Sequence, residues 1–206
     1  MIDLLVATSN PGKFAEVQAF LRRLPIRIRS LREFEHPPAV IEDGATFEAN
    51  ALKKARSLAD FSGLFTLADD SGLEVDALNG APGIYSARYC GEECNDDDNN
   101  RKLLSELNGV AEARRSARFV CALALCGPDR SIMADWIVRE SCAGFIAFAG
   151  KGANGFGYDP LFFYPPLGKT FGEIDRQTKA MVSHRGKALK KLAESLPELV
   201  DLTHLT

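Results

Sequence analysis

Two long, largely apolar runs separated by a short turn-forming segment constrain the fold of this chain more than any other feature. The runs cover Ala117–Cys126 and Ser131–Glu140, with Gly127-Pro-Asp-Arg130 between them. Runs of strand length that are joined by Gly and Pro are typical of a β-hairpin. A further strand is expected at Cys142–Phe148. The sequence therefore predicts a hairpin followed by another strand in the second half of the chain.

The first half of the chain alternates strand and helix patterns. Ile2–Ala7 is a short apolar run that predicts a buried strand, and the apolar positions that follow fit one face of a helix over Gly12–Leu24. Further along, the patterns predict a strand near Ile26–Arg29, a helix at Thr46–Phe61, strands at Leu64–Ala68 and Leu73–Asp76, and a helix at Asn99–Leu107. Strand–helix–strand units combined with hairpins indicate an α/β fold with a mixed twisted sheet flanked by helices.

Length and charge limit the classes of protein to which the chain can belong. A chain of 206 residues suits a single domain, 1–206, with room for two lobes. The formal charge of −3 gives no overall attraction to nucleic acid or to an anionic membrane. There is no signal peptide pattern and no apolar run of membrane-spanning length, so we expect a cytoplasmic protein.

The cysteines give no sign of a metal site. The five are Cys90, Cys94, Cys121, Cys126 and Cys142, and no two of them form a Cys-x-x-Cys pair. This spacing argues against zinc. Cys121 and Cys126 lie in an apolar run and are expected as core strand residues, and the thiols of a cytoplasmic protein are expected to be reduced.

Two adjacent carboxylates follow the apolar run Leu64–Ala68. Asp69 and Asp70 precede Ser71 and Gly72, so the sequence predicts a Gly-containing turn that carries two negative charges. Carboxylates on a turn are a usual way to hold Mg²⁺, an ion that takes one or two carboxylates and shares its other positions with water and substrate phosphates. The alternative is that both residues only stabilise the turn, a position that Asp favours.

The segment Thr8-Ser-Asn-Pro-Gly-Lys13 lies between the first predicted strand and the first predicted helix. Backbone N–H groups at a helix start can point at an anion and Lys13 adds a positive charge, so the segment predicts a phosphate-binding loop. It is not a Walker A loop, because the Gly-x4-Gly-Lys-Ser/Thr pattern is absent. The alternative is an ordinary turn and helix cap at Ser9-Asn10-Pro11.

A second candidate binding segment is Ser183-His-Arg185. Ser183 is placed as the N-cap of a helix whose buried stripe is formed by five residues, namely Ala188, Leu189, Leu192, Ala193 and Leu196. His184 and Arg185 then lie in the first turn, where cations oppose the helix dipole. An anion or a carbonyl-bearing ligand at that end explains them better, although an exposed arginine needs no function.

Five motifs in one order along the chain resemble those of a known family. They are Thr8-Ser-Asn-Pro-Gly-Lys13, Ala68-Asp-Asp-Ser-Gly-Leu73, Gly80-Ala-Pro-Gly-Ile-Tyr-Ser-Ala-Arg88, Gly155-Phe-Gly-Tyr-Asp-Pro160 and Ser183-His-Arg185. Over nearly its whole length the chain resembles the Ham1-like inosine/xanthosine triphosphate pyrophosphatases. It looks most like the bacterial dITP/XTP pyrophosphatase branch of that family.

The resemblance implies a two-lobed α/β fold with the nucleotide between the lobes, and a homodimer. It implies Mg²⁺-dependent hydrolysis of deaminated purine nucleoside triphosphates (dITP, ITP, XTP) to the monophosphate and pyrophosphate. Asp70 would accept the proton of the attacking water and hold the metal, with Asp69 close by, and Lys13 would act in catalysis. The residues implied for substrate binding are Thr8, Ser9, Asn10, Pro11, Gly12, Lys13, Ser71, Phe156, Gly157, Tyr158, Asp159, Lys179, His184 and Arg185. Phosphoryl transfer needs positioning and charge neutralisation more than covalent chemistry, so no Ser or Cys nucleophile is required.

Recognition of the base is expected to depend on the later motifs. An aromatic side chain in the Gly-flanked loop of Phe156 and Tyr158 can stack on a purine, although stacking tolerates any base. Lys179, His184 and Arg185 can supply donors to a 6-keto oxygen, and an adenine amino group would then face donors and leave them unpaired. The alternative for Phe156 and Tyr158 is core packing at a turn.

The chain departs from the family pattern at two positions. Ala49 stands where the family's Thr-Phe-x-Glu-Asn-Ala motif has Glu. If Thr46 is the N-cap, the capping box is therefore incomplete, at a cost of about 1 kcal/mol or less of local helix stability. Ile41 stands where many members have a glutamate that can bind the metal, and Glu42 comes one place later. Glu42 is therefore a candidate second ligand of Mg²⁺.

Two other functions stay open at this point. One is a related pyrophosphatase for pyrimidine nucleotides, such as the Maf-like enzymes, against which Ser183-His-Arg185 and Phe156-Gly-Tyr-Asp159 argue. The other is a nucleotide-binding module without turnover, acting as a sensor or partner protein. The presence of Lys13 and Asp70 argues against that module, because binding alone needs no water-activating carboxylate.

Overall fold

The computed structural model describes residues 2–128 and 135–200, which form two compact units. Unit 1 takes its described residues from Met1–Asp70, Cys121–Glu140 and Gly186–Thr206, and unit 2 consists of Ser71–Val120 and Ser141–Arg185. Among the helices in the described part of the chain, none is long and apolar enough to cross a membrane.

Unit 1 is built on parallel strands joined by helices. Strand β1 (Ile2–Ala7) pairs in parallel with β2 (Ile26–Ser30), and helix α1 (Pro11–Leu21) connects the two. Strand β1 also pairs in parallel with the first part of β3 (Phe65–Val75), which helix α2 (Phe47–Ser62) precedes. Parallel neighbours need such crossover connections, so the strand–helix alternation of the sequence is realised here.

Local signals set the ends of these helices. Asn10 caps α1, with Pro11 at the first helical position. Thr46 caps α2 by accepting a hydrogen bond from the Ala49 N–H at 3.1 Å, as predicted, while the methyl group of Ala49 cannot return a bond. Gly63 ends α2 in the left-handed conformation, with φ of 66°.

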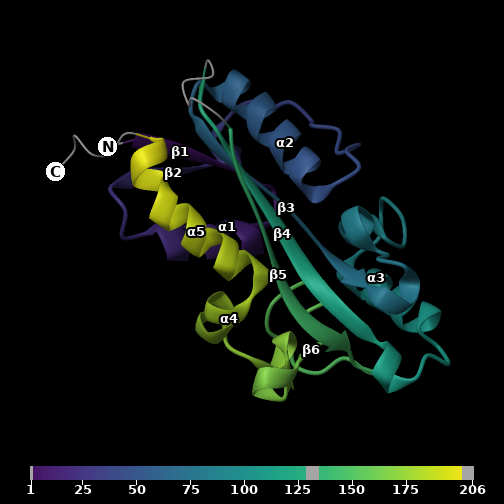
Figure 1. Ribbon diagram of the computed structural model, residues 1–206. Coiled ribbons are helices and arrows are strands. Elements are labelled where there is room, and N and C mark those ends of the chain that lie inside the picture. Colours follow the sequence, from purple (N-terminus) through teal and green to yellow (C-terminus); the bar gives the residue numbers. More distant parts are fainter. Residues whose placement is uncertain (1, 129–134, 201–206) are drawn as a thin grey trace. The chain divides into compact units, whose positions relative to one another are not determined.

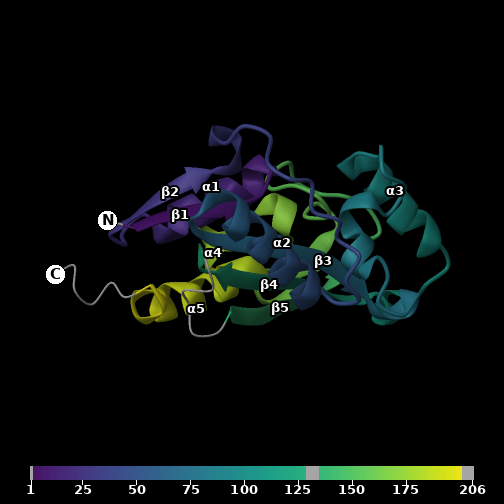
Figure 2. The same ribbon diagram turned by 90° about the horizontal axis from the view of Figure 1, so that it is seen from above.

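The core of unit 1 joins the strands to two helices. Leu4 of β1 and Leu21 of α1 pack with Leu189 and Leu192 of helix α5 (His184–Leu199). The predicted stripe of α5 is confirmed, since Ala188, Leu189, Leu192 and Leu196 are buried and Ala193 is half-buried. Helix α2 lies on the opposite side of the strands from α5 (Figures 1 and 2).

Unit 2 contains shorter elements. Strand β6 (Phe162–Tyr164) pairs antiparallel with β5 (Trp136–Ile146) and with β7 (Lys169–Thr170). Its other regular elements are the second part of β3, the first part of β4 (Ser116–Cys126), and the helices α3 (Asp96–Glu106) and α4 (Arg176–Val182). Leu73, Phe119, Phe162 and Phe171 are core members of this unit.

The strands follow the order β2-β1-β3-β4-β5-β6-β7 (Figure 1). Parallel pairs among the first strands and antiparallel pairs among the last make the sheet mixed. The predicted α/β fold, a mixed sheet flanked by helices, is confirmed.

Several predicted boundaries were wrong. The expected strands Leu64–Ala68 and Leu73–Asp76 are the single strand β3, and the expected strand Cys142–Phe148 is largely the end of β5. Helix α4 was not predicted, and α1 ends at Leu21 and not at Leu24. Residues 129–134, which include part of the predicted hairpin turn and the start of its second strand, lie outside the described residues.

Candidate active site

The segment after β1 is organised by Asn10. Its Oδ1 accepts hydrogen bonds from the N–H groups of Gly12 at 2.8 Å and Lys13 at 3.1 Å, and Thr8 Oγ1 accepts one from the Asn10 N–H at 3.1 Å. These two amide groups at the helix start are therefore bonded to the cap in this structure, as in the capping alternative. Ser9 is exposed, and Pro11 has no N–H to offer. The charged group that this segment carries is the Lys13 ammonium.

Lys13 is held by Asp69 from the same unit. Its Nζ lies 2.5 Å from Asp69 Oδ1, and Asp69 Oδ2 accepts a hydrogen bond from the buried thiol of Cys121 at 3.3 Å. Asp69 is buried and Lys13 is partly exposed, so the carboxylate fixes the lysine side chain while the ammonium keeps access to solvent. Asp69 thereby positions a cation.

Asp70 lies in a different environment from its neighbour. Because both residues belong to β3 and not to a turn, their side chains point to opposite faces of the sheet. Asp70 is only 6% exposed. Its carboxylate takes a hydrogen bond from the side chain of Asn50, while its Oδ2 has no hydrogen-bond partner among the described residues. The two adjacent carboxylates therefore have different partners: Asp69 pairs with Lys13, and Asp70 accepts a hydrogen bond from Asn50.

The electrostatics of Asp70 suit a proton acceptor. The pKa of Asp70 is raised to about 6, chiefly by burial and to a smaller extent by the charge of Glu42, against the opposing effects of Lys13, Lys54 and the Asn50 hydrogen bond. A carboxyl group whose pKa lies near neutrality is charged at pH 7 and still able to take a proton. Carboxylates with this property are frequent at functional sites.

Ile41 stands where the family pattern has a glutamate, and Glu42 follows it; the structure places the two side chains in different surroundings. Ile41 is 72% exposed, so the position at which the family pattern places a glutamate faces solvent. Glu42 is half-buried, its Oε1 lies 2.7 Å from Lys54 Nζ, and its charge acts on Asp70. Glu42 is therefore the carboxylate that unit 1 brings near Asp70.

Asn50 and Lys54 of α2 were missed by the sequence interpretation. Asn50 Oδ1 accepts a hydrogen bond from the Gly44 N–H at 2.8 Å, so one buried amide connects the Glu42 segment to Asp70. A Cβ atom at Gly44 would lie 2.7 Å from that oxygen, which explains glycine at this position. The available signal was an Asn on a helix face that is otherwise apolar, one helical turn before Lys54.

The donor set of unit 1 can be compared with what Mg²⁺ requires. Among the described residues there is no group of three or more His, Cys, Asp or Glu side chains that could hold a metal ion. Mg²⁺ needs only one or two carboxylates when water and substrate phosphates complete its shell. The unpartnered Oδ2 of Asp70 and the nearby carboxylate of Glu42 fit that requirement.

The Gly155–Pro160 motif of unit 2 forms a loop that is fixed by a buried ion pair. Asp159 Oδ2 accepts a hydrogen bond from the Phe156 N–H at 2.8 Å and lies 2.5 Å from Lys179 Nζ. A Cβ at Gly155, where φ is +79°, would come within 1.9 Å of the same carboxylate oxygen. The loop therefore requires glycine at position 155 and an anion at position 159.

Two cations lie near the ring of Phe156, an aromatic residue of this loop. Lys179 Nζ lies 4.7 Å from the centre of its ring and Arg185 Cζ lies 5.5 Å from it. Arg185 is 2% exposed and donates a hydrogen bond to Ser71 Oγ at 3.2 Å. The His184 ring stacks on Phe119, with the ring centres 4.7 Å apart. Unit 2 thus contains Ser71, Phe156, Lys179 and Arg185, which come from four separate segments and are connected by these contacts.

Tyr158 and Gly157 have other roles in the loop. Tyr158 is buried among the core residues of unit 2, and its hydroxyl donates to the Ser86 carbonyl at 2.8 Å. For Tyr158 the core-packing alternative therefore fits better than stacking on a base. Gly157 is held by α3, since its N–H donates to Asp96 Oδ2 at 2.7 Å and its carbonyl accepts from Asn100 Nδ2 at 3.0 Å.

Curated relatives match the chain over almost its entire length. A relative from Syntrophobacter fumaroxidans is 49% identical over 98% of this chain and 84% of its own length, and one from an Exiguobacterium species is 51% identical over 95% of this chain and 98% of its own. Both carry the name dITP/XTP pyrophosphatase.

Solved structures of Ham1 proteins are also similar to this chain in sequence and in fold. A HAM1 protein from Coxiella burnetii is 42% identical, with a TM-score of 0.87 over 96% of this chain and 100% of its own. The Ham1 protein of Staphylococcus aureus is 39% identical, with a TM-score of 0.83 over 94% of this chain and 97% of its own. The sequence pattern of the Ham1 family matches residues 4–195. The chain belongs to the Ham1 family, as the order of its five motifs indicated.

Proposed function

We propose that this protein hydrolyses deaminated purine nucleoside triphosphates, namely dITP, ITP and XTP, to the monophosphate and pyrophosphate. The observation that carries the proposal is Asp70, a buried carboxylate with a pKa of about 6 and an oxygen without a hydrogen-bond partner in the described chain. A module that only binds nucleotides has no need for such a group. The names of the relatives at 49% and 51% identity support the same substrate class.

Asp70 and Glu42 are the residues that would hold Mg²⁺. When bound, the ion would neutralise charge on the phosphates and lower the pKa of coordinated water. Asp70 is suited to accept a proton from the attacking water, because its pKa lies close to the pH at which the reaction runs. Lys54, whose Nζ lies 2.7 Å from Glu42, keeps that carboxylate near Asp70 in an otherwise repulsive arrangement.

Lys13 is proposed to bind the phosphates of the substrate. Phosphoryl transfer concentrates negative charge on non-bridging oxygens, so a fixed ammonium stabilises the transition state without covalent chemistry. Asp69 holds Lys13 through the 2.5 Å ion pair and prevents the long side chain from sampling other positions. Thr8, Ser9, Asn10, Pro11 and Gly12 are proposed to contribute by shaping the segment from which Lys13 projects.

The residues of unit 2 are proposed to bind the base. The Phe156 ring offers a stacking surface, and Lys179 and Arg185 surround it with donors and positive charge. A 6-keto oxygen can accept from such donors, whereas the amino group of adenine cannot. Ser71, Gly157, Asp159 and His184 are proposed to complete this part of the site, with Asp159 positioning the loop.

Further features are proposed on the family resemblance together with the length, charge and composition of the chain. These are one pyrophosphatase domain over 1–206 made of two lobes, a homodimer, a cytoplasmic location, and no stable association with nucleic acid or membrane.

Substituting Asp70 by asparagine tests the proposal most simply. The variant keeps the shape and burial of the side chain but cannot accept a proton, so we expect nearly complete loss of pyrophosphate release with dITP. Asp43→Asn is a matched control, because Asp43 is an exposed carboxylate of the same unit that pairs with Lys53. Normal turnover by folded Asp70→Asn protein would remove Asp70 from the mechanism.

A further inference from the structure

Two cysteines lie together in the loop between the 3-10 helix η3 (Gly83–Arg88) and α3. The thiols of Cys90 and Cys94 hydrogen-bond to each other, and Cys90 is exposed while Cys94 is partly exposed. The other cysteines, Cys121, Cys126 and Cys142, are buried. Of the five cysteines, all of which lie in the described part of the chain, these two combine accessibility with mutual contact.

The turn around Gly91 brings the two thiols together. The Cys94 N–H donates to the Gly91 carbonyl at 3.4 Å, so the chain folds back on itself directly after Cys90. Gly91 has a φ of +136°, and a Cβ at this position would lie 3.5 Å from Cys94 Sγ. The Cys90 N–H is in turn fixed by Asn99 Oδ1 at 2.8 Å. A disulfide requires the two sulfurs to approach to about 2.05 Å, and the turn at Gly91 places the two thiols on one side of the loop, where they hydrogen-bond to each other.

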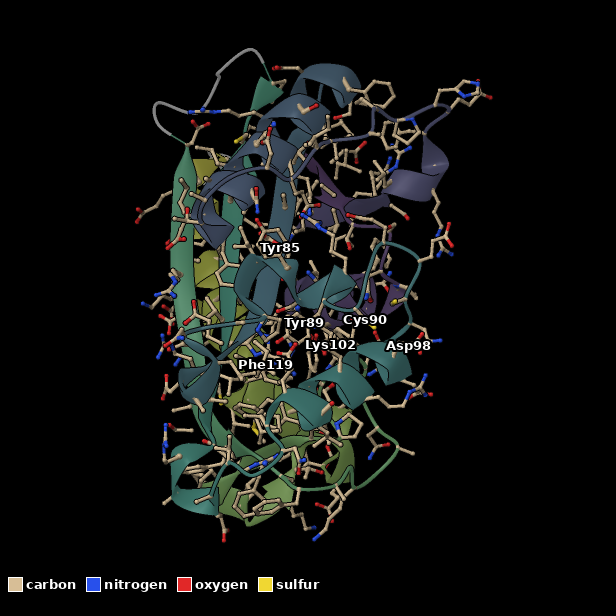
Figure 3. All side chains as sticks on the ribbon, turned by 90° about the vertical axis from the view of Figure 1, so that its right-hand side faces the viewer. Tyr85, Tyr89, Cys90, Asp98, Lys102 and Phe119 are labelled. Atoms are coloured by element: carbon tan, nitrogen blue, oxygen red, sulfur yellow. The ribbon has the colours of Figure 1, made fainter. Side chains whose placement is uncertain are left out.

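The two thiols have charged neighbours of opposite sign. The ammonium of Lys102 acts electrostatically with Cys90, and the carboxylate of Asp98 acts with Cys94. Figure 3 shows Cys90 in the loop before α3 and both Asp98 and Lys102 on α3. Lys102 is held there by Glu106, 2.5 Å from its Nζ, and by the ring of Tyr89, 4.7 Å away. The hydrogen bond with Cys90, burial and the charges around it raise the pKa of the Cys94 thiol. Cys90 is exposed and Cys94 only partly exposed, so Cys90 is the member of the pair that an oxidant in solution meets first and Cys94 is the thiol that resolves it.

We propose that Cys90 and Cys94 form an oxidisable dithiol that oxidants of the peroxide class convert to an intramolecular disulfide. In the first step the Cys90 thiolate attacks one peroxide oxygen, the O–O bond breaks, and the sulfur becomes a sulfenic acid while the other oxygen leaves and is protonated. In the second step Cys94 sulfur attacks Cys90 sulfur, its thiol proton is released, and the hydroxyl leaves as water. The two thiols lose two electrons and two protons in total, and the peroxide gains them.

The disulfide would lie directly before the helix that holds the Phe156 loop. Asn95 caps α3, and the first turns of α3 bond to both polar groups of Gly157 through Asp96 and Asn100. Closing a covalent ring one residue before this cap alters the start of α3 and, through Gly157, the loop next to Phe156. An effect on base binding rests on the proposed function; formation of the disulfide does not.

Mass spectrometry of the full chain tests the modification directly. Trypsin cleaves after Arg88 and Arg101, so both thiols fall in the single peptide Tyr89–Arg101. The folded protein is exposed to hydrogen peroxide, quenched with iodoacetamide, denatured and digested. We expect this peptide to lose two hydrogen atoms and to escape alkylation, and we expect dithiothreitol to restore both thiols.

Variants separate this reaction from unspecific oxidation. Cys94→Ser is expected to stop at a Cys90 sulfenic acid that dimedone traps, whereas the matched control Cys126→Ser, in which a buried thiol is replaced, forms the disulfide as the parent does. Lys102→Gln is expected to lower the rate of Cys90 oxidation several-fold, and Lys151→Gln, an exposed lysine elsewhere in unit 2, leaves it unchanged.

The same peptide also shows the outcome that would overturn the proposal. Alkylation of both Cys90 and Cys94 in folded, peroxide-treated protein, with no disulfide in the 89–101 peptide, would show that the pair is not an oxidisable dithiol. The peptide mass needs no enzymatic turnover, so this failure is distinguishable from failure of the proposed function. If both hold, oxidised protein has a raised KM for dITP that dithiothreitol reverses, and Cys90→Ser protein is insensitive to peroxide.

Discussion

Replacing Asp70 by asparagine is expected to stabilise the metal-free protein while it removes turnover. Burial raises the pKa of Asp70 from its ordinary value of 3.8 to about 6 in the native state. At neutral pH the native protein therefore holds a charge that the unfolded chain accommodates more easily. One pKa unit corresponds to about 1.4 kcal/mol, so ionised Asp70 lowers the free energy of unfolding by about 3 kcal/mol, which a neutral amide of the same shape avoids.

The direction of the pKa shift also fixes how this gain depends on pH. Below pH 3.8 the carboxyl group is protonated in both the native and the unfolded state, and the stability difference between variant and parent is smallest. Between 3.8 and about 6 the unfolded chain has released its proton and the native state retains it, so the parent loses stability relative to the variant as the pH rises. Above about pH 6 the difference reaches its full value and stays constant.

Urea unfolding of the parent and of Asp70→Asn in EDTA, at about pH 4 and about pH 8, measures both quantities. Asp43→Asn is the control, because the Asp43 carboxylate is exposed and its pKa is lowered, chiefly by its hydrogen bond with Lys53. Added Mg²⁺ is expected to stabilise the parent and not Asp70→Asn. Equal stability of parent and variant at about pH 8, or a less stable variant, would refute the description of Asp70 as a desolvated carboxylate.

Three further substitutions test the groups around the site. Lys13→Ala is expected to weaken binding of nucleoside triphosphates more than of monophosphates, measured by calorimetry on the Asp70→Asn background; equal losses would exclude Lys13 from phosphate binding. Asp159→Asn removes the carboxylate that lies 2.5 Å from the buried ammonium of Lys179 and should lower the free energy of unfolding by about 3–5 kcal/mol in a denaturant titration, with Lys179→Met added to it recovering part of the loss. No recovery in that double variant would show that the two residues act independently. Phe156→Ala should reduce the affinity for purine nucleotides by about 1–3 kcal/mol whatever the base, because stacking does not discriminate, and a loss confined to dITP would contradict a stacking role.

The strand–helix alternation and the binding motifs could be predicted because each depends on neighbours in sequence. The apolar run of β1 and the stripe of α5 are periodic patterns, and Thr46 is recognisable as a cap from its position before a helix. The prediction of a turn at Asp69-Asp70-Ser71-Gly72 was wrong for the same reason, because it too depended on neighbours in sequence. These residues favour turns locally, yet the sheet carries them through as part of the continuous strand β3, because pairing with neighbouring strands outweighs local preference.

The parts of the site that were missed depend on contacts between distant segments. Asn50 became informative only when the fold placed its amide between Gly44 and Asp70. Tyr158 and Phe156 are equivalent aromatic residues in the sequence of the loop, but one fills the core of unit 2 and the other lies beside Lys179. Nor could spacing show that the Asn10 side chain takes the amide hydrogens of the helix start.

Pyrophosphate release is the most direct measure of the proposed activity. The assay compares dITP, XTP, ATP, GTP and dTTP as substrates, each with and without Mg²⁺. Metal-dependent release from dITP and XTP, far faster than from ATP and GTP, is the expected result. Rapid release from dTTP would instead indicate a pyrimidine enzyme, and binding of every nucleotide without release of pyrophosphate would contradict the assignment of Asp70 as a proton acceptor in catalysis.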